Sequence, residues 1–175
     1  MKRNRMAAIL AASFFTTLAA GPAAAHVTLE TGEAITGSYY KATFTVPHGC
    51  EGAATTRVRV QIPDGISGIK PQPRTGWKLA VVKAKLATPL DNGHGGKITE
   101  TVREVIWTGG PLPDEQFEEF KIQMKLPDAP GTTVYFPVVQ DCTKGVNRWI
   151  EIPEAGKSSH DLKLPAPGLR LKPKA

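Results

Sequence analysis

His26 is the residue whose position in this sequence points most directly to metal chemistry. It follows a segment with three basic residues in its first five positions, an apolar run over 6–20 and a small-residue exit that ends in Ala25. This order is typical of a secretory signal peptide that is cleaved after an A-x-A pattern. We therefore predict that residues 1–25 are a signal peptide, that the mature chain begins at His26, and that it is periplasmic or secreted.

A histidine at the first position offers one metal ion two nitrogens, its α-amine and its imidazole Nδ1. The amine titrates at about pH 8, so a metal ion can displace its proton at neutral pH. Nitrogen donors of this kind suit Cu(II), and Met124 is the only methionine after the predicted cleavage site, which disfavours a thioether-rich Cu(I) site. The sequence thus predicts that copper (Cu²⁺) binds at His26, with the alternative that His26 is an incidental first residue.

The loop that holds His48 and Glu51 is predicted to lie near His26. Apolar alternation predicts strands over 27–30 and 39–46, and the hairpin between them returns the end of the second strand to the start of the first. Glu51 is therefore the predicted oxygen ligand of the metal. His48 is its rival in the same loop, because imidazole also suits copper.

Two further carboxylates, Glu30 and Glu33, are alternatives to Glu51. They follow His26 by four and seven residues. On an extended strand this spacing places them at least about 12 Å away along the chain, beyond easy reach of the same ion.

Cys50 and Cys142 are the two cysteines of the chain. Because an exported protein meets an oxidising compartment, we predict that they form a disulfide. A dithiolate metal site is the alternative, although no C-x-x-C spacing supports it. The disulfide would carry Trp149, seven residues past Cys142, towards Glu51, where we expect the indole to wall the metal site.

Short segments of alternating apolar and polar residues dominate the sequence after position 25, and prolines interrupt any helical pattern. We therefore predict an all-β fold, an antiparallel β-sandwich of the Ig or cupredoxin-like kind with about eight strands. The strands are expected at residues 27–30, 39–46, 57–62, 78–84, 102–107, 120–126, 134–139 and 148–152.

One domain is predicted, over residues 26–165. Residues 166–175 are basic and rich in proline, and we expect them to form a poorly ordered C-terminal tail. The glycine-rich segment 91–96 is expected to be a mobile hairpin tip.

The formal charge is +6 for the full sequence but +3 after position 25, because the predicted signal peptide holds three basic residues and no acidic ones. The remaining lysines and arginines form no dense cluster, so we predict no nucleic-acid partner. No later apolar stretch approaches the roughly 20 residues of a membrane helix, so we predict no membrane span in the mature chain.

Several short motifs together resemble the YcnI-like (DUF1775) family of periplasmic copper-binding proteins. They are His-Val-Thr-Leu at 26–29, Gly-Ser-Tyr-Tyr at 37–40, Val-Pro-His-Gly-Cys at 46–50, Thr-Thr at 55–56, Pro-Gln-Pro at 71–73, Gly-Trp at 76–77 and Arg-Trp-Ile-Glu-Ile-Pro at 148–153. The resemblance implies a β-sandwich and a Cu(II) site of the monohistidine-brace type. Its histidine, glutamate and nearby tryptophan would here be His26, Glu51 and Trp149.

The leading functional hypothesis is a non-enzymatic Cu(II) binder in copper trafficking or homeostasis, with other periplasmic copper carriers as partners. One alternative is a copper-dependent oxidative enzyme with a two-histidine brace. Since His94 and His160 are expected in the hairpin tip and the late tail, only His48 is left as the second histidine. The other alternative is a metal-free Ig-like interaction module. Its candidate contacts are Arg57, Arg59, Lys121 and Lys125.

Overall fold

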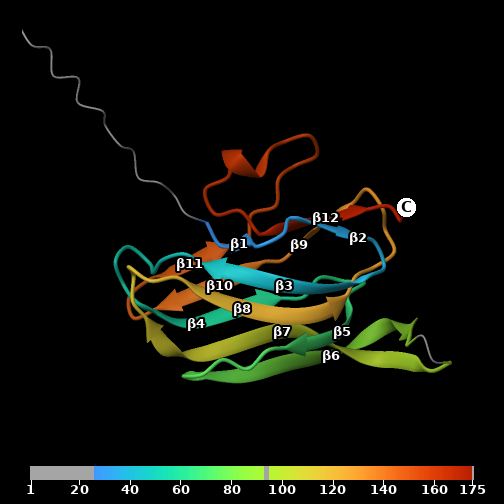
Figure 1. Ribbon diagram of the computed structural model, residues 1–175, viewed down its shortest axis with the longest axis horizontal. Coiled ribbons are helices and arrows are strands. Elements are labelled where there is room, and N and C mark those ends of the chain that lie inside the picture. Colours follow the sequence, from blue (N-terminus) through green and yellow to red (C-terminus); the bar gives the residue numbers. More distant parts are fainter. Residues whose placement is uncertain (1–25, 93–94, 175) are drawn as a thin grey trace, which may run out of the picture.

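The computed structural model describes residues 26–92 and 95–174, and it shows the predicted antiparallel β-sandwich (Figure 1). The predicted signal peptide, residues 1–25, lies outside the described residues. The strands are β1 (Thr28–Leu29), β2 (Glu33–Ile35), β3 (Tyr39–Val46), β4 (Thr55–Gln61), β5 (Ser67–Pro71), β6 (Trp77–Asp91), β7 (Lys97–Leu112), β8 (Glu118–Lys125), β9 (Thr133–Tyr135), β10 (Val138–Cys142), β11 (Val146–Trp149) and β12 (Gly168–Lys172). A single 3₁₀ turn, η1 (Ser159–Asp161), is the helical element of this part of the chain.

Two main sheets form the sandwich, and a third, smaller sheet covers one edge. Their strand orders are β1-β3-β8-β5, β11-β10-β4-β7-β6 and β2-β12-β9. Trp107 on β7 contacts Phe120 on β8, with ring centroids 5.2 Å apart, so side chains of the two main sheets meet in the core. Both side chains are buried, as are the inward-facing residues of β3 and β4, which is the alternation that the sequence showed.

The prediction of about eight strands is too low, because the described residues contain twelve. Each predicted strand has a counterpart, but residues 134–139 divide into β9 and β10. The division falls at Phe136 and Pro137, and proline has no N–H to donate to a ladder. The strands β2 and β5 are too short or too polar to show an alternating pattern, so the sequence did not predict them.

The prediction of a poorly ordered tail over residues 166–175 is wrong for residues 168–172, which form β12. This strand pairs in parallel with β2 and antiparallel with β9, and Leu169 and Leu171 are fully buried. These two leucines alternate with Arg170 and Lys172, so the period-two pattern was present but hidden by the basic composition. The domain therefore extends beyond residue 165 to include β12.

β6 and β7 form the predicted hairpin, with Asp91 paired to Lys97. His94 lies outside the described residues. β6 continues well past the predicted end at residue 84. The prediction missed this part of the strand because its side chains on both faces are largely exposed and show no clear alternation. Within residues 26–92 and 95–174, no helix is long and apolar enough to cross a membrane.

Candidate metal site

The structure brings His26, His48 and Trp149 together at one end of the sandwich. The ring centroid of Trp149 lies 5.6 Å from that of His26 and 6.4 Å from that of His48. Trp149, the last residue of β11, is only 4% exposed, whereas both histidines are partly exposed. A buried indole thus separates the interior from two imidazoles that solvent can reach.

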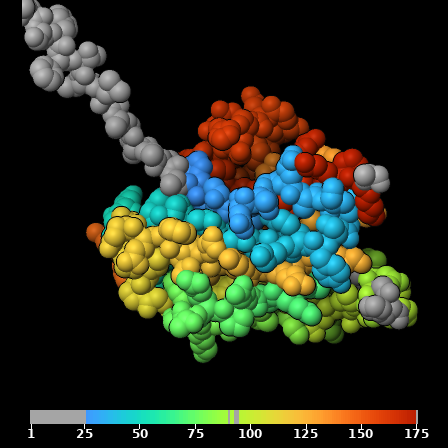
Figure 2. All heavy atoms as spheres, viewed as in Figure 1, coloured from blue at the N-terminus to red at the C-terminus, as the bar shows by residue number. Residues whose placement is uncertain are grey.

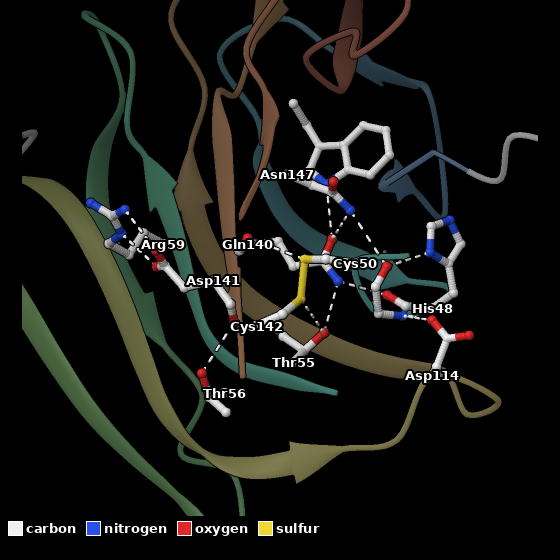
Figure 3. The surroundings of a disulfide bond; sticks show 12 residues. His48, Cys50, Thr55, Thr56, Arg59, Asp114, Gln140, Asp141, Cys142 and Asn147 are labelled. Carbon is white, nitrogen blue, oxygen red and sulfur yellow. Dashed lines mark hydrogen bonds and ion pairs between the residues drawn. A yellow bond between two sulfur atoms is a disulfide. The ribbon is translucent and has the colours of Figure 1, made fainter. Parts of the chain in front are cut away.

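Gln140 on β10 fixes the indole and the loop of His48 at once (Figure 3). Its Oε1 accepts a hydrogen bond from Trp149 Nε1 at 3.0 Å, and its Nε2 donates to the His48 carbonyl at 2.6 Å and to Thr55 Oγ1 at 2.7 Å. The side chain is fully buried. Because a buried amide is stable only when it is hydrogen-bonded, these contacts specify where the indole ring and the His48 backbone lie.

The backbone after His48 forms a tight, anchored turn. Gly49 N donates to Asp114 Oδ1 at 2.9 Å, and the backbones of Cys50 and Ala53 exchange hydrogen bonds of 2.9 and 3.0 Å. A Cβ at Gly49 would lie 2.0 Å from the Ala53 carbonyl oxygen, so only glycine fits there. The His48 loop therefore has little freedom to shift.

Cys50 and Cys142 form the predicted disulfide, with an S–S distance of 2.07 Å. It joins the His48 loop to β10, beside Gln140 (Figure 3). The alternative of a dithiolate metal site is wrong, since neither sulfur is a free thiol.

Asp141, next to this disulfide, pairs with two arginines of β4. Arg57 Nε and Arg59 Nε donate to Asp141 Oδ2 at 2.8 and 3.2 Å. Burial raises the pKa of the Asp141 carboxyl, but the hydrogen bonds and charges of the two guanidinium groups outweigh it, so the pKa lies below its usual value. The charged carboxylate helps to hold β10 against β4.

Glu51 and His26 line different cavities. Glu51 is exposed in the turn, with φ of 51°, and lines a cavity of about 330 Å³ with Lys144 and Asn147. His26 lines a different cavity, of about 230 Å³. In the part of the chain that the structure describes, no three histidine, cysteine, aspartate or glutamate side chains gather closely enough to hold a metal ion.

The two alternative carboxylates, Glu30 and Glu33, lie just after β1 and at the start of β2. Glu33 forms an ion pair with Lys172 across β2 and β12. Glu30 is exposed just after β1, and its backbone N–H donates to the Thr43 carbonyl at 3.0 Å.

His160 lines the same cavity as His26, contrary to its expected place in a remote tail. Two backbone hydrogen bonds, from Glu151 N to the Leu164 carbonyl and from Ala166 N to the Glu151 carbonyl, close the segment between them into a loop that carries η1. Figure 2 shows this orange-red loop standing beside the blue N-terminal strand. No local sequence pattern predicts this return, because it depends on pairing between distant residues.

A scan of family models matches residues 26–171 to one described as "Domain of unknown function (DUF1775)". The chain belongs to the DUF1775 family. The match begins at His26 and reaches Leu171 in β12, so the DUF1775 domain includes the strand that the sequence analysis assigned to a tail.

A solved structure with the same architecture is the crystal structure of an uncharacterized protein from Nocardia farcinica, which reveals an immunoglobulin-like fold. It is 31% identical to this DUF1775 chain, with 84% of this chain and 98% of the Nocardia chain covered and a TM-score of 0.62. No curated protein matches this chain.

Proposed function

We propose that the mature protein binds one Cu(II) ion at its N-terminus and acts as a copper carrier or buffer outside the cytoplasmic membrane. The observation that carries the proposal is the position of His26: it begins the family match and its ring lies against the buried Trp149. Cleavage before His26 would give this residue a free α-amine beside its imidazole, and the two nitrogens would chelate the ion.

The residues around His26 fit Cu(II) by their chemistry. Amine and imidazole nitrogens are donors that Cu(II) favours, and a second imidazole, that of His48, flanks the same indole. Trp149 would close the inner side of the site and exclude water there. The proposal rests on His26 rather than on the predicted oxygen ligand Glu51, which lines a separate cavity.

The exposure of His26 supports a role as a copper carrier. His26 is partly exposed at the end of the sandwich, so an ion held there would be within reach of a partner protein. Transfer of the ion to another carrier would need such an exposed site, because donor ligands of one protein would have to approach the ion on the other.

Titration with Cu(II) of two purified forms tests the proposal. One form begins at His26 and the other carries one additional glycine before it. The additional residue converts the chelating amine into an amide, so we expect affinity to fall by at least about 100-fold, or about 2.7 kcal/mol. Equal unfolding midpoints would show that both forms fold. Equal affinities would contradict the amine chelate.

A copper-dependent oxidative enzyme is a second candidate, favoured by the two imidazoles that both lie near Trp149. Reductant-dependent peroxide formation by the copper-loaded protein would support it. If the folded mature protein bound no copper while a protein partner co-purified, a metal-free Ig-like interaction module would replace both candidates.

A further inference from the structure

We propose that His48 provides the third nitrogen ligand of the metal, through Nε2, so that the site holds three nitrogens and no carboxylate. This inference rests on the proposed copper site at His26 and specifies its ligand set. The observation behind it is that the rings of His26 and His48 lie 5.6 and 6.4 Å from one indole ring, that of Trp149.

The protonation of His48 suits a metal ligand. Its Nδ1 lies 2.6 Å from the Gly49 carbonyl oxygen. A carbonyl only accepts hydrogen bonds, so Nδ1 carries the proton and donates, and Nε2 is the basic nitrogen. Histidines that bind metals commonly donate their other N–H to a backbone carbonyl in this way, which fixes the tautomer and the ring orientation.

The backbone around His48 is held in place before any metal arrives. Gln140 Nε2 donates to the His48 carbonyl, Asp114 accepts from Gly49 N, and Asn147 Nδ2 donates to the Gly49 carbonyl at 3.4 Å. The disulfide at Cys50 ties the next residue to β10. A ligand on such a loop loses little conformational freedom on binding, which favours affinity.

The donor count agrees with the rest of the structure. His26 supplies two nitrogens from one residue, so a three-nitrogen site needs only two side chains. This is compatible with the finding that no three potential ligand side chains cluster among the described residues. Two other residues are rivals of His48 for the role of third ligand. Glu51 is the ligand predicted from the sequence, although it lines another cavity, and His160, exposed on η1, lines the same cavity as His26.

Pulsed electron paramagnetic resonance of the Cu(II)-loaded mature protein tests the inference by counting coordinated imidazoles. The variants are His48→Phe, which keeps an aromatic ring against Trp149 but has no nitrogen, together with Glu51→Gln and His160→Phe as controls. We expect the signature of two imidazoles in the parent protein and in both controls, and of one imidazole in His48→Phe. Cu(II) affinity should fall by at least about tenfold in His48→Phe alone, since even the partners of metal ligands contribute 10–100-fold.

The outcomes separate the inference from the proposed function. Two imidazoles in His48→Phe, or a lost imidazole in His160→Phe, would overturn the role of His48 while leaving the N-terminal site intact. A changed spectrum in Glu51→Gln alone would assign the third ligand to the carboxylate. If His48→Phe does not fold, as judged by its unfolding midpoint, His48→Gln takes its place. Failure of the proposed function would instead show as equal affinity with and without the additional N-terminal residue.

Discussion

Gln140 is the residue on which the positions of the His48 loop and the Trp149 ring both depend. Replacing it by leucine would leave the His48 carbonyl and the Trp149 indole N–H without their buried partner. We expect Gln140→Leu to reduce the free energy of unfolding by about 2–4 kcal/mol, because each unsatisfied buried group contributes about 1–3 kcal/mol. Urea unfolding measures this, and Cu(II) affinity should fall as the loop loosens.

Gln123 on β8 provides the matched control, because its side chain is exposed. Gln123→Leu should change stability by no more than about 0.5 kcal/mol. Equal effects of the two substitutions would contradict the role assigned to the buried amide.

Asp141 should make stability depend on pH. Its pKa in the folded protein is lowered below the unfolded value, so its stabilising contribution is present above the unfolded pKa of about 3.9 and is lost as pH falls through the folded pKa. The difference in unfolding free energy between the parent and Asp141→Asn should therefore be largest at neutral pH and shrink below about pH 4. Urea unfolding at pH 7 and pH 3 measures it. A difference that stays constant with pH would contradict the charged pair with Arg57 and Arg59.

At the scale of residues, the pairing of Cys50 with Cys142 is confirmed, and it was predicted from the number of cysteines and an expected oxidising compartment. Cleavage before His26 stays a prediction from the pattern of residues 1–25. The roles of Gln140 and His160 could not be predicted, because a buried amide and a returning loop depend on partners far along the chain. The sequence also did not indicate that Glu51 and His26 would line different cavities, because this depends on the tight turn at residues 50–53.

Among the elements, β12 differs most from the prediction, because a poorly ordered tail was expected where the structure has a paired strand. Leu171 is fully buried between β2 and β9, so Leu171→Ala should lower the free energy of unfolding by about 2–5 kcal/mol. Arg170 is its exposed neighbour on the same strand, and Arg170→Ala should have an effect within about 0.5 kcal/mol. Thermal or urea unfolding of both variants measures this. A stable Leu171→Ala protein would mean that β12 is dispensable.

Strands with one buried and one exposed face could be predicted from the sequence, and strands without this contrast could not. β3 has the predicted bounds because its apolar side chains at every second position, from Tyr40 to Val46, are all buried. β6 is an edge strand whose side chains are mostly exposed, so its second half carried no apolar signal. β12 alternates clearly but was hidden by its basic residues.

At the scale of the whole molecule, the sandwich gathers distant segments at one end. The start of β1, the loop after β3 and the end of β11 meet there, and each carries one of His26, His48 and Trp149 (Figure 1). The antiparallel pairing of β1 with β3 explains the first two, and the disulfide and the pairing of β10 with β11 explain the third. The fold class therefore follows from local alternation, whereas the composition of the site follows from long-range pairing.

Native mass spectrometry of the protein recovered after export, with Cu(II) added in slight excess, tests whether processing and copper binding occur together. We expect the mass of a chain that begins at His26, lower by two hydrogens for the disulfide and higher by one retained copper ion. A polypeptide that begins at any other residue, or a chain that begins at His26 but retains no copper, would contradict an N-terminal copper site.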